Sequence, residues 1–141
     1  MITRRLCFPL LLALACGGGS GTAVPTPMAS DDRLSEIIAA ALDSDARAES
    51  ADTLYASDAV IVADGENRFA PPRYASIGSG GAVAITTSRL EVRGMVAWAQ
   101  VEYRWMSTRE SSVREGHVTF VLAPDERGAW RIRHAHSSSP H

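Results

Sequence analysis

The chain contains no lysine, and only two of its 141 residues are cysteine. All 14 of its Lys-plus-Arg residues are arginine, and two of them, Arg4 and Arg5, lie close to the N-terminus. Without those two, 12 arginines face 16 acidic residues, a net charge of −4. This balance provides no basic surface for nucleic acid, so we expect no nucleic-acid partner.

The sequence also lacks an apolar run long enough to be a permanent membrane span. An apolar run extends from Leu6 to Ala15, follows Arg4 and Arg5 and ends at Cys16. This pattern is typical of a secretory signal and is too short to cross a bilayer. We therefore expect residues 1–16 to be a signal peptide and the protein to be exported.

The end of this segment suggests how the protein is retained after export. Residues 12–16 read LALAC, which resembles the lipobox of bacterial lipoproteins. The resemblance implies a lipid on Cys16 and anchoring in the cell envelope, on the periplasmic or outer-membrane face. The alternative is ordinary cleavage near Ala15 and secretion. Cys7 leaves with the signal, so the mature protein keeps at most one cysteine and forms no internal disulfide.

The next segment predicts a tether. Residues 17–30 are rich in glycine, serine and proline, with too little apolar surface to repay the entropy of ordering. The remaining residues, 31–141, suffice for one domain and are too few for two.

This domain begins with a helical pattern. Ser30 can cap a helix, and Asp31 and Asp32 favour its first turn. Apolar residues then recur at the spacing of one buried helix face: Leu34, Ile37, Ile38, Ala41 and Leu42. The polar residues 43–45 predict a break and the start of a second helix over residues 46–55. Together the two helices would form a hairpin.

The rest of the domain has a β pattern. Residues 65–81, which contain four glycines and Pro71-Pro72, predict mostly loop with a short extended piece around 74–77. We therefore expect an α+β fold, with an N-terminal helical hairpin packed on a strongly curved, mostly antiparallel sheet. The predicted strands are residues 59–63, 88–93, 95–107, 113–122 and 129–138.

Three parts of the sequence carry a resemblance to a known family. They are residues 41–60, the strand from Gly94 to Trp98, and the ending 130–138. In their order and spacing the chain resembles the SnoaL-like and ketosteroid-isomerase-like domains of the nuclear transport factor 2 superfamily. The resemblance implies a cone-shaped fold, an apolar pocket at one end and, frequently, a homodimer through the outer face of the sheet. The chain departs from the family between residues 67 and 86, where many members carry a further helix.

The last strand holds the strongest candidates for chemistry. Under simple alternation Trp130, Ile132, His134 and His136 share one face. Because the first two belong to the core, we expect both histidines to continue toward the open end of the cone. There they could act as general acid or base or bind a ligand, since histidine titrates near neutral pH. The alternative is that they only hydrogen-bond within a packed strand end, and we assign no metal and no cofactor.

The strand around Glu102 leaves two interpretations open, because Glu102 and Arg104 share a face with Trp98. If that face lines the cone, Glu102 could act as a base. If it lies outside, Glu102 and Arg104 form a solvated pair and Trp98 is a dimer contact. The catalytic candidates are His134, His136 and Glu102. The candidates for binding a ligand are Tyr55, Trp98, Tyr103, Trp105, His134 and His136.

Three functions are compatible with these residues. We favour an exported domain that binds a small apolar or amphipathic molecule in a cone pocket. The first alternative is an isomerase, cyclase or hydrolase that uses His134 or His136 as general acid/base, oriented by Glu102. The second is a dimeric interaction module of the cell envelope. The carboxylate and acidic donors of steroid isomerases have no residue-by-residue match here, so that activity is not carried over.

Overall fold

The structure, a computed structural model, describes residues 30–140. The expected signal peptide, most of the tether and Cys16 lie outside these residues. Among residues 30–140, no helix combines the length and apolar character needed to cross a membrane. The elements, in chain order, are α1 (Asp31–Ala46), the 3₁₀ turn η1 (Asp52–Leu54), β1 (Tyr55–Ala63), β2 (Glu66–Asn67), β3 (Gly81–Arg93), β4 (Val96–Ser107), β5 (Val113–Pro124) and β6 (Trp130–Ser138).

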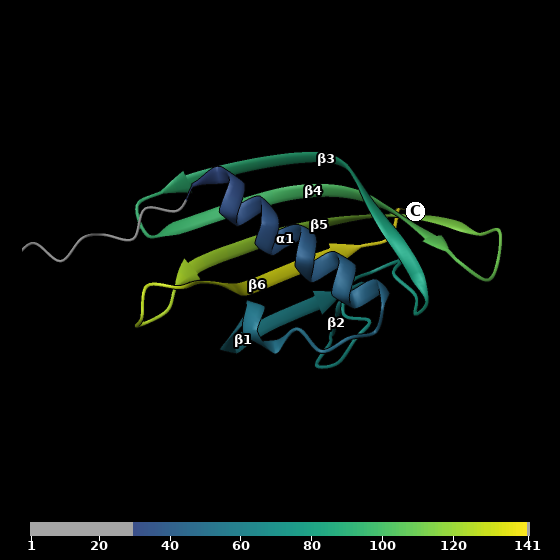
Figure 1. The fold of residues 1–141 in the computed structure, drawn as a ribbon, viewed down its shortest axis with the longest axis horizontal. Coiled ribbons are helices and arrows are strands. Elements are labelled where there is room, and N and C mark those ends of the chain that lie inside the picture. The colour runs from purple at the N-terminus through teal and green to yellow at the C-terminus, as the bar shows by residue number, and fades with distance from the viewer. Residues whose placement is uncertain (1–29, 141) are drawn as a thin grey trace, which may run out of the picture.

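The strands form one mixed sheet that α1 crosses on one face (Figure 1). Their order is β2-β1-β6-β5-β4-β3. Strands β1 and β6 are parallel, and the other neighbouring pairs are antiparallel. The predicted α+β class with a mostly antiparallel sheet is therefore confirmed.

The first helix has the predicted cap and the predicted buried face. The Ser30 side chain accepts a hydrogen bond from the backbone N–H of Arg33 at 3.3 Å. All five apolar residues of the predicted stripe, from Leu34 to Leu42, are buried. They pack against the sheet and form one wall of the core.

The predicted second helix is wrong. Helix α1 continues through residues 43–45 to Ala46, and only the single turn η1 follows before β1. The polar residues do not interrupt the helix, because each finds a partner within it or beside it. Ser44 Oγ donates to the Ala41 carbonyl at 3.1 Å, and the Asp45 carboxylate accepts backbone N–H groups from the loop that follows β2.

The three C-terminal strands match the prediction to within two residues at each end, whereas β1 and β3 are longer than predicted. Strand β1 begins at Tyr55 rather than 59, and β3 begins at Gly81 rather than 88. Residues 68–80 contain no helix or strand, as the proline and glycine content predicts. The expected extended piece at 74–77 is a series of turns.

This loop fills the space under one end of α1. Tyr74 and Ile77 are buried in the core, and the Tyr74 ring meets Phe120 edge to face with centroids 5.4 Å apart. The Tyr103 hydroxyl donates to the Ala75 carbonyl. A Cβ atom at Gly116 would lie 2.4 Å from the Tyr103 ring, so only glycine leaves room for that ring. Side chains therefore occupy the part of the cone that this loop covers.

Candidate functional site

The two histidines of β6 lie on the outer face of the sheet, opposite to the side that we predicted. In the ladder between β5 and β6, Leu122 pairs with Ile132 but Val121 pairs with His134, so Arg133 is an extra residue in a β-bulge. A bulge shifts the alternation of side chains by one position. Before it Trp130 and Ile132 are buried, and after it Ala135 and Ser137 are.

Strand β4 alternates as predicted and settles which face lies outside. Tyr103 and Trp105 are buried in the core, whereas Glu102 and Arg104 are exposed on the outer face, with Trp98 half-buried beside them. The predicted pair between Glu102 and Arg104 does not form. Arg104 Nε donates to Glu115 at 2.9 Å, and Glu102 accepts a bond of 3.0 Å from Thr87 Oγ1.

The predicted site residues are thus divided between two faces. Trp98, Glu102, His134 and His136 lie outside, and Tyr103 and Trp105 lie inside. Tyr55, at the start of β1, is half-buried at the edge of the core. No single pocket can use all of them.

The outer face carries a group of polar side chains that strand register brings together. Across four strands, Thr87, Glu102, His117 and Ser138 form one row, and Arg89, Gln100, Thr119 and His136 form the next. We call these two rows the outer polar patch. They line an open cavity of about 390 Å³.

The outer polar patch contains a histidine that the sequence reasoning did not select as catalytic. His117 Nδ1 lies 3.9 Å from Glu102 Oε1, beyond hydrogen-bond distance, and about half of each side chain is exposed (52% and 54%). The patch can offer donors and acceptors to a polar ligand. In this arrangement it does not hold an aligned acid/base pair.

A second cavity opens beside β1, between the η1 turn and the loop after β2. Its volume is about 280 Å³, and we call it the Arg73 groove. Its lining includes Asp52, Tyr55, Ile61, Arg68, Phe69 and Arg73. Of these, the sequence reasoning selected only Tyr55.

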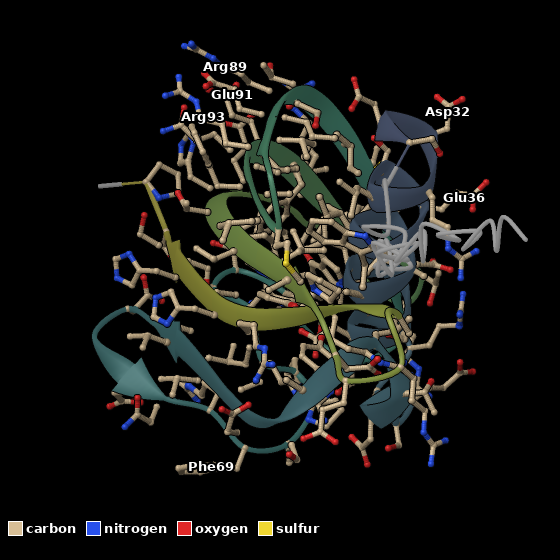
Figure 2. The ribbon with its side chains drawn as sticks, turned by 90° about the vertical axis from the view of Figure 1, so that its left-hand side faces the viewer. Asp32, Glu36, Phe69, Arg89, Glu91 and Arg93 are labelled. Atoms are coloured by element: carbon tan, nitrogen blue, oxygen red, sulfur yellow. The ribbon has the colours of Figure 1, made fainter. Side chains whose placement is uncertain are left out.

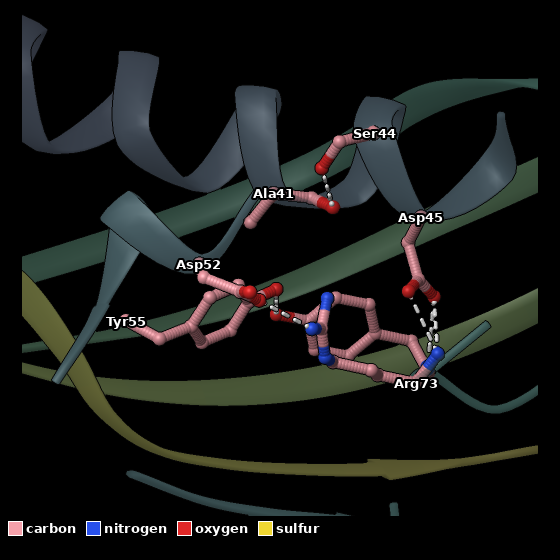
Figure 3. Close-up of polar contacts among 7 residues, drawn as sticks. Ala41, Ser44, Asp45, Asp52, Tyr55 and Arg73 are labelled. Atoms are coloured by element: carbon pink, nitrogen blue, oxygen red, sulfur yellow. Dashed lines mark hydrogen bonds and ion pairs between the residues drawn. The ribbon is translucent and has the colours of Figure 1, made fainter. Parts of the chain in front are cut away.

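Arg73 is the unusual group of this groove (Figure 3). Its side chain is only 8% exposed, and its Nη2 donates to Asp52 Oδ1 at 2.9 Å. Its guanidinium lies over the Tyr55 ring, 4.8 Å from the centroid. Its Nη1 has no hydrogen-bond partner among residues 30–140. A buried cation that leaves a donor unused is rare, because desolvation of such a donor is costly.

Asp45 anchors the backbone of this segment to the end of α1. The backbone N–H groups of Arg73 and Tyr74 donate to its carboxylate at 2.7 and 3.0 Å, as Figure 3 shows in part. Burial raises the pKa of Asp45, while these two hydrogen bonds and the charge of Arg73 act in the opposite direction. The position of Arg73 is therefore set by its own backbone as well as by its side chain.

The neighbouring tyrosines act as neutral structural groups. The Tyr55 and Tyr74 hydroxyl oxygens lie 2.8 Å apart. Burial raises the pKa values of Tyr55, Tyr74 and Tyr103 above the ordinary value for tyrosine. All three stay protonated at neutral pH, and the hydroxyl of Tyr103 is already engaged by the loop. Tyr103 thus offers no free group to a ligand in this arrangement.

The fold described above, one helix on an open, curved mixed sheet, belongs to the α+β class. We compared the chain with known proteins to find which α+β fold it has. No family model and no curated protein matches the chain. Solved structures do. A nuclear transport factor 2-like superfamily protein from Salmonella enterica matches at 18% identity and a TM-score of 0.59, over 78% of this chain and 90% of that one.

Two further solved structures lead to the same class. A nuclear transport factor 2-like protein with a cystatin-like fold from Novosphingobium aromaticivorans matches at 16% identity and a TM-score of 0.59, over 77% of this chain and 80% of that one. A ketosteroid isomerase-like protein from Erwinia carotovora matches at 16% identity and a TM-score of 0.53, over 79% of this chain and 99% of that one. The domain has the nuclear transport factor 2-like fold, and the resemblance noted in the sequence is confirmed at that level.

Proposed function

We propose that this domain binds a small amphipathic molecule in the Arg73 groove. The observation that carries the proposal is that one groove is lined by both a buried, incompletely paired guanidinium and an exposed aromatic ring. Phe69 is 87% exposed and, in Figure 2, projects from the edge of the domain. Both residues line the groove, together with the buried Ile61.

The groove can bind both parts of such a molecule. Covering a large apolar side chain stabilises a complex by roughly 1.5 to 3 kcal/mol, and Phe69 is available to be covered. Arg73 supplies charged donors at the other end. The volume lies near the lower limit of ordinary small-molecule sites, roughly 300 Å³, which favours a small ligand.

The test is calorimetric titration of the chain without its signal residues, with decanoate as the probe. Phe69→Ser should weaken binding at least fivefold, because it removes the apolar cover. Val113→Ser is the matched control, since Val113 is also an exposed apolar residue (61%) but does not line the groove. Equal loss in both variants, or no binding of decanoate to the unaltered chain, would contradict the proposal.

Acid/base catalysis at the outer polar patch is a second candidate, supported by the placement of Glu102, His117 and His136 around one cavity. Hydrolysis of p-nitrophenyl acetate tests it. A rate above that of buffer that Glu102→Gln and His136→Ala each lower at least tenfold would support catalysis. A rate that neither variant changes would argue against it.

The proposal also includes where the domain acts. The sequence of residues 1–16 supports export, with Cys16 as the lipid anchor in the cell envelope or with simple secretion as the alternative. The family resemblance noted in the sequence implies a homodimer through the outer face of the sheet, and we include it in the proposal. Mass spectrometry of the mature protein from membranes tests the first point, and analytical ultracentrifugation tests the second.

A further inference from the structure

We propose that the ligand of the Arg73 groove is a monocarboxylate, and that its carboxylate replaces Asp52 on the guanidinium of Arg73. This inference rests on the proposed function and names the chemical class of the ligand. It follows from three features of the groove: an unused donor, an exchangeable acceptor and a second arginine that is already paired.

The unused donor is Nη1 of Arg73. Arginine carries five N–H donors in a rigid planar fork, and carboxylates bind this fork best when both oxygens engage two nitrogens. Here only Nη2 has a side-chain carboxylate, and it contacts one oxygen of Asp52. Trp105 and Trp130 also carry buried indole N–H groups without partners, but neither lines the groove. Arg73 is thus the residue at which an incoming anion gains a charged partner.

The exchangeable acceptor is Asp52. Its side chain is 78% exposed and belongs to the single turn η1. In the part of the chain that the structure describes, its carboxylate makes this one hydrogen bond. This exposed carboxylate can return to water, and a ligand carboxylate that takes its place keeps the buried guanidinium of Arg73 paired. Asp52 therefore occupies the place that a ligand carboxylate would take, and its departure would open the way to Nη1.

The charge of the groove favours one carboxylate rather than two. The other arginine, Arg68, forms an ion pair with Glu66 on the short strand β2, with its Nη2 2.9 Å from a carboxylate oxygen. Tyr55 covers one face of the Arg73 guanidinium, so the open edge of the fork is the available binding surface. Phe69 and Ile61 then offer apolar contacts to the remainder of the molecule. A single anionic head with an apolar tail matches this arrangement.

The experiment compares decanoate with 1-decanol, which has the same tail without the charge. Titrations use the unaltered chain, Asp52→Asn and Arg73→Lys. We expect decanoate to bind at least tenfold more tightly than decanol. Asp52→Asn should raise the affinity for decanoate about threefold or more, because the competing carboxylate is gone. Arg73→Lys keeps the positive charge but loses the planar fork, and should lower decanoate affinity at least tenfold while leaving decanol unchanged.

The matched control is Asp58→Asn. Asp58 is a similarly exposed carboxylate (72%) that pairs with another arginine, Arg133, at 2.7 Å. This variant should leave decanoate affinity unchanged. Circular dichroism and thermal melting of Asp52→Asn and Arg73→Lys establish that both variants are folded before they are titrated.

The outcomes separate this inference from the proposed function. If decanoate and decanol bind equally, and Phe69→Ser weakens both, the groove binds small apolar molecules and the monocarboxylate inference is overturned. If Asp52→Asn weakens decanoate binding, Asp52 is a partner of the ligand rather than its competitor, and the inference is again overturned. If neither probe binds any folded variant, the proposed function fails together with it.

Discussion

The Arg73 groove and the outer polar patch lie in the same small domain, and they differ in what holds their polar groups. In the groove, Arg73 is buried and its backbone is fastened by Asp45, yet one of its nitrogens is unpaired. In the patch, Glu102 and His117 are half exposed, and water can satisfy them. The comparison teaches that an unsatisfied group points to a ligand only where water cannot reach it.

The largest expected effect is on the anchor of the groove. Asp45→Ala should lower the free energy of unfolding by about 2 to 4 kcal/mol, because it leaves the buried N–H groups of Arg73 and Tyr74 without an acceptor. Denaturant unfolding measures this change. Asp43→Ala, which removes an exposed helix carboxylate (52%), is the control and should cost less than about 1 kcal/mol.

The same carboxyl group should give stability a pH dependence. Because burial raises the pKa of Asp45 in the folded state, the folded chain holds this proton more tightly than the unfolded chain. The contribution of the group is therefore most favourable below its unfolded pKa and declines as pH rises through the raised folded pKa. Unfolding of the unaltered chain and of Asp45→Asn across acidic pH measures it. The free energy of unfolding of the unaltered chain, relative to that of Asp45→Asn, should fall as pH rises. A relative stability that stays constant or increases with pH would contradict this sign.

A smaller effect is expected in the packing beneath the loop. Gly116→Ala would place a Cβ atom 2.4 Å from the Tyr103 ring, whose hydroxyl is held by the Ala75 carbonyl. Overpacking of this kind costs about 1 to 3 kcal/mol. Thermal unfolding measures it. The double variant Gly116→Ala, Tyr103→Leu should regain part of the lost stability, and failure to do so would locate the strain elsewhere.

The smallest effect is expected on the outer face. Glu102→Gln and His136→Ala should each change the free energy of unfolding by no more than about 0.5 kcal/mol, because both side chains are exposed. Denaturant unfolding is again the measurement. A loss of more than about 1 kcal/mol in either variant would show that the outer polar patch is as constrained as the groove. The two regions would then not differ in what holds their polar groups.

Much of the fold could be predicted from periodicity. The buried stripe of α1 and the alternation of β4 are local patterns, in which apolar side chains at fixed spacing select one face. The continuation of α1 through residues 43–45 could not be predicted in this way. Asp45 has the chemistry of a helix cap, and it stays inside the helix because loop residues distant in sequence donate to it.

The candidate site was less accessible to sequence reasoning. One extra residue at Arg133 moves His134 and His136 to the outer face, and no local signal marks that bulge. Arg73 follows Pro71-Pro72 in a loop with no periodicity, so nothing in its neighbours indicated that it would be buried. Strand register alone brings His117 beside Glu102.

The sequence by itself determined the α+β class, the C-terminal strands and the overall resemblance, because these follow from short-range spacing of apolar residues. Only the tertiary structure decided which face each histidine occupies and which arginine is buried. The physical reason is that burial and hydrogen-bond satisfaction depend on partners far apart in the chain. For Arg73, those partners are the last turn of α1, the η1 turn and the Tyr55 ring.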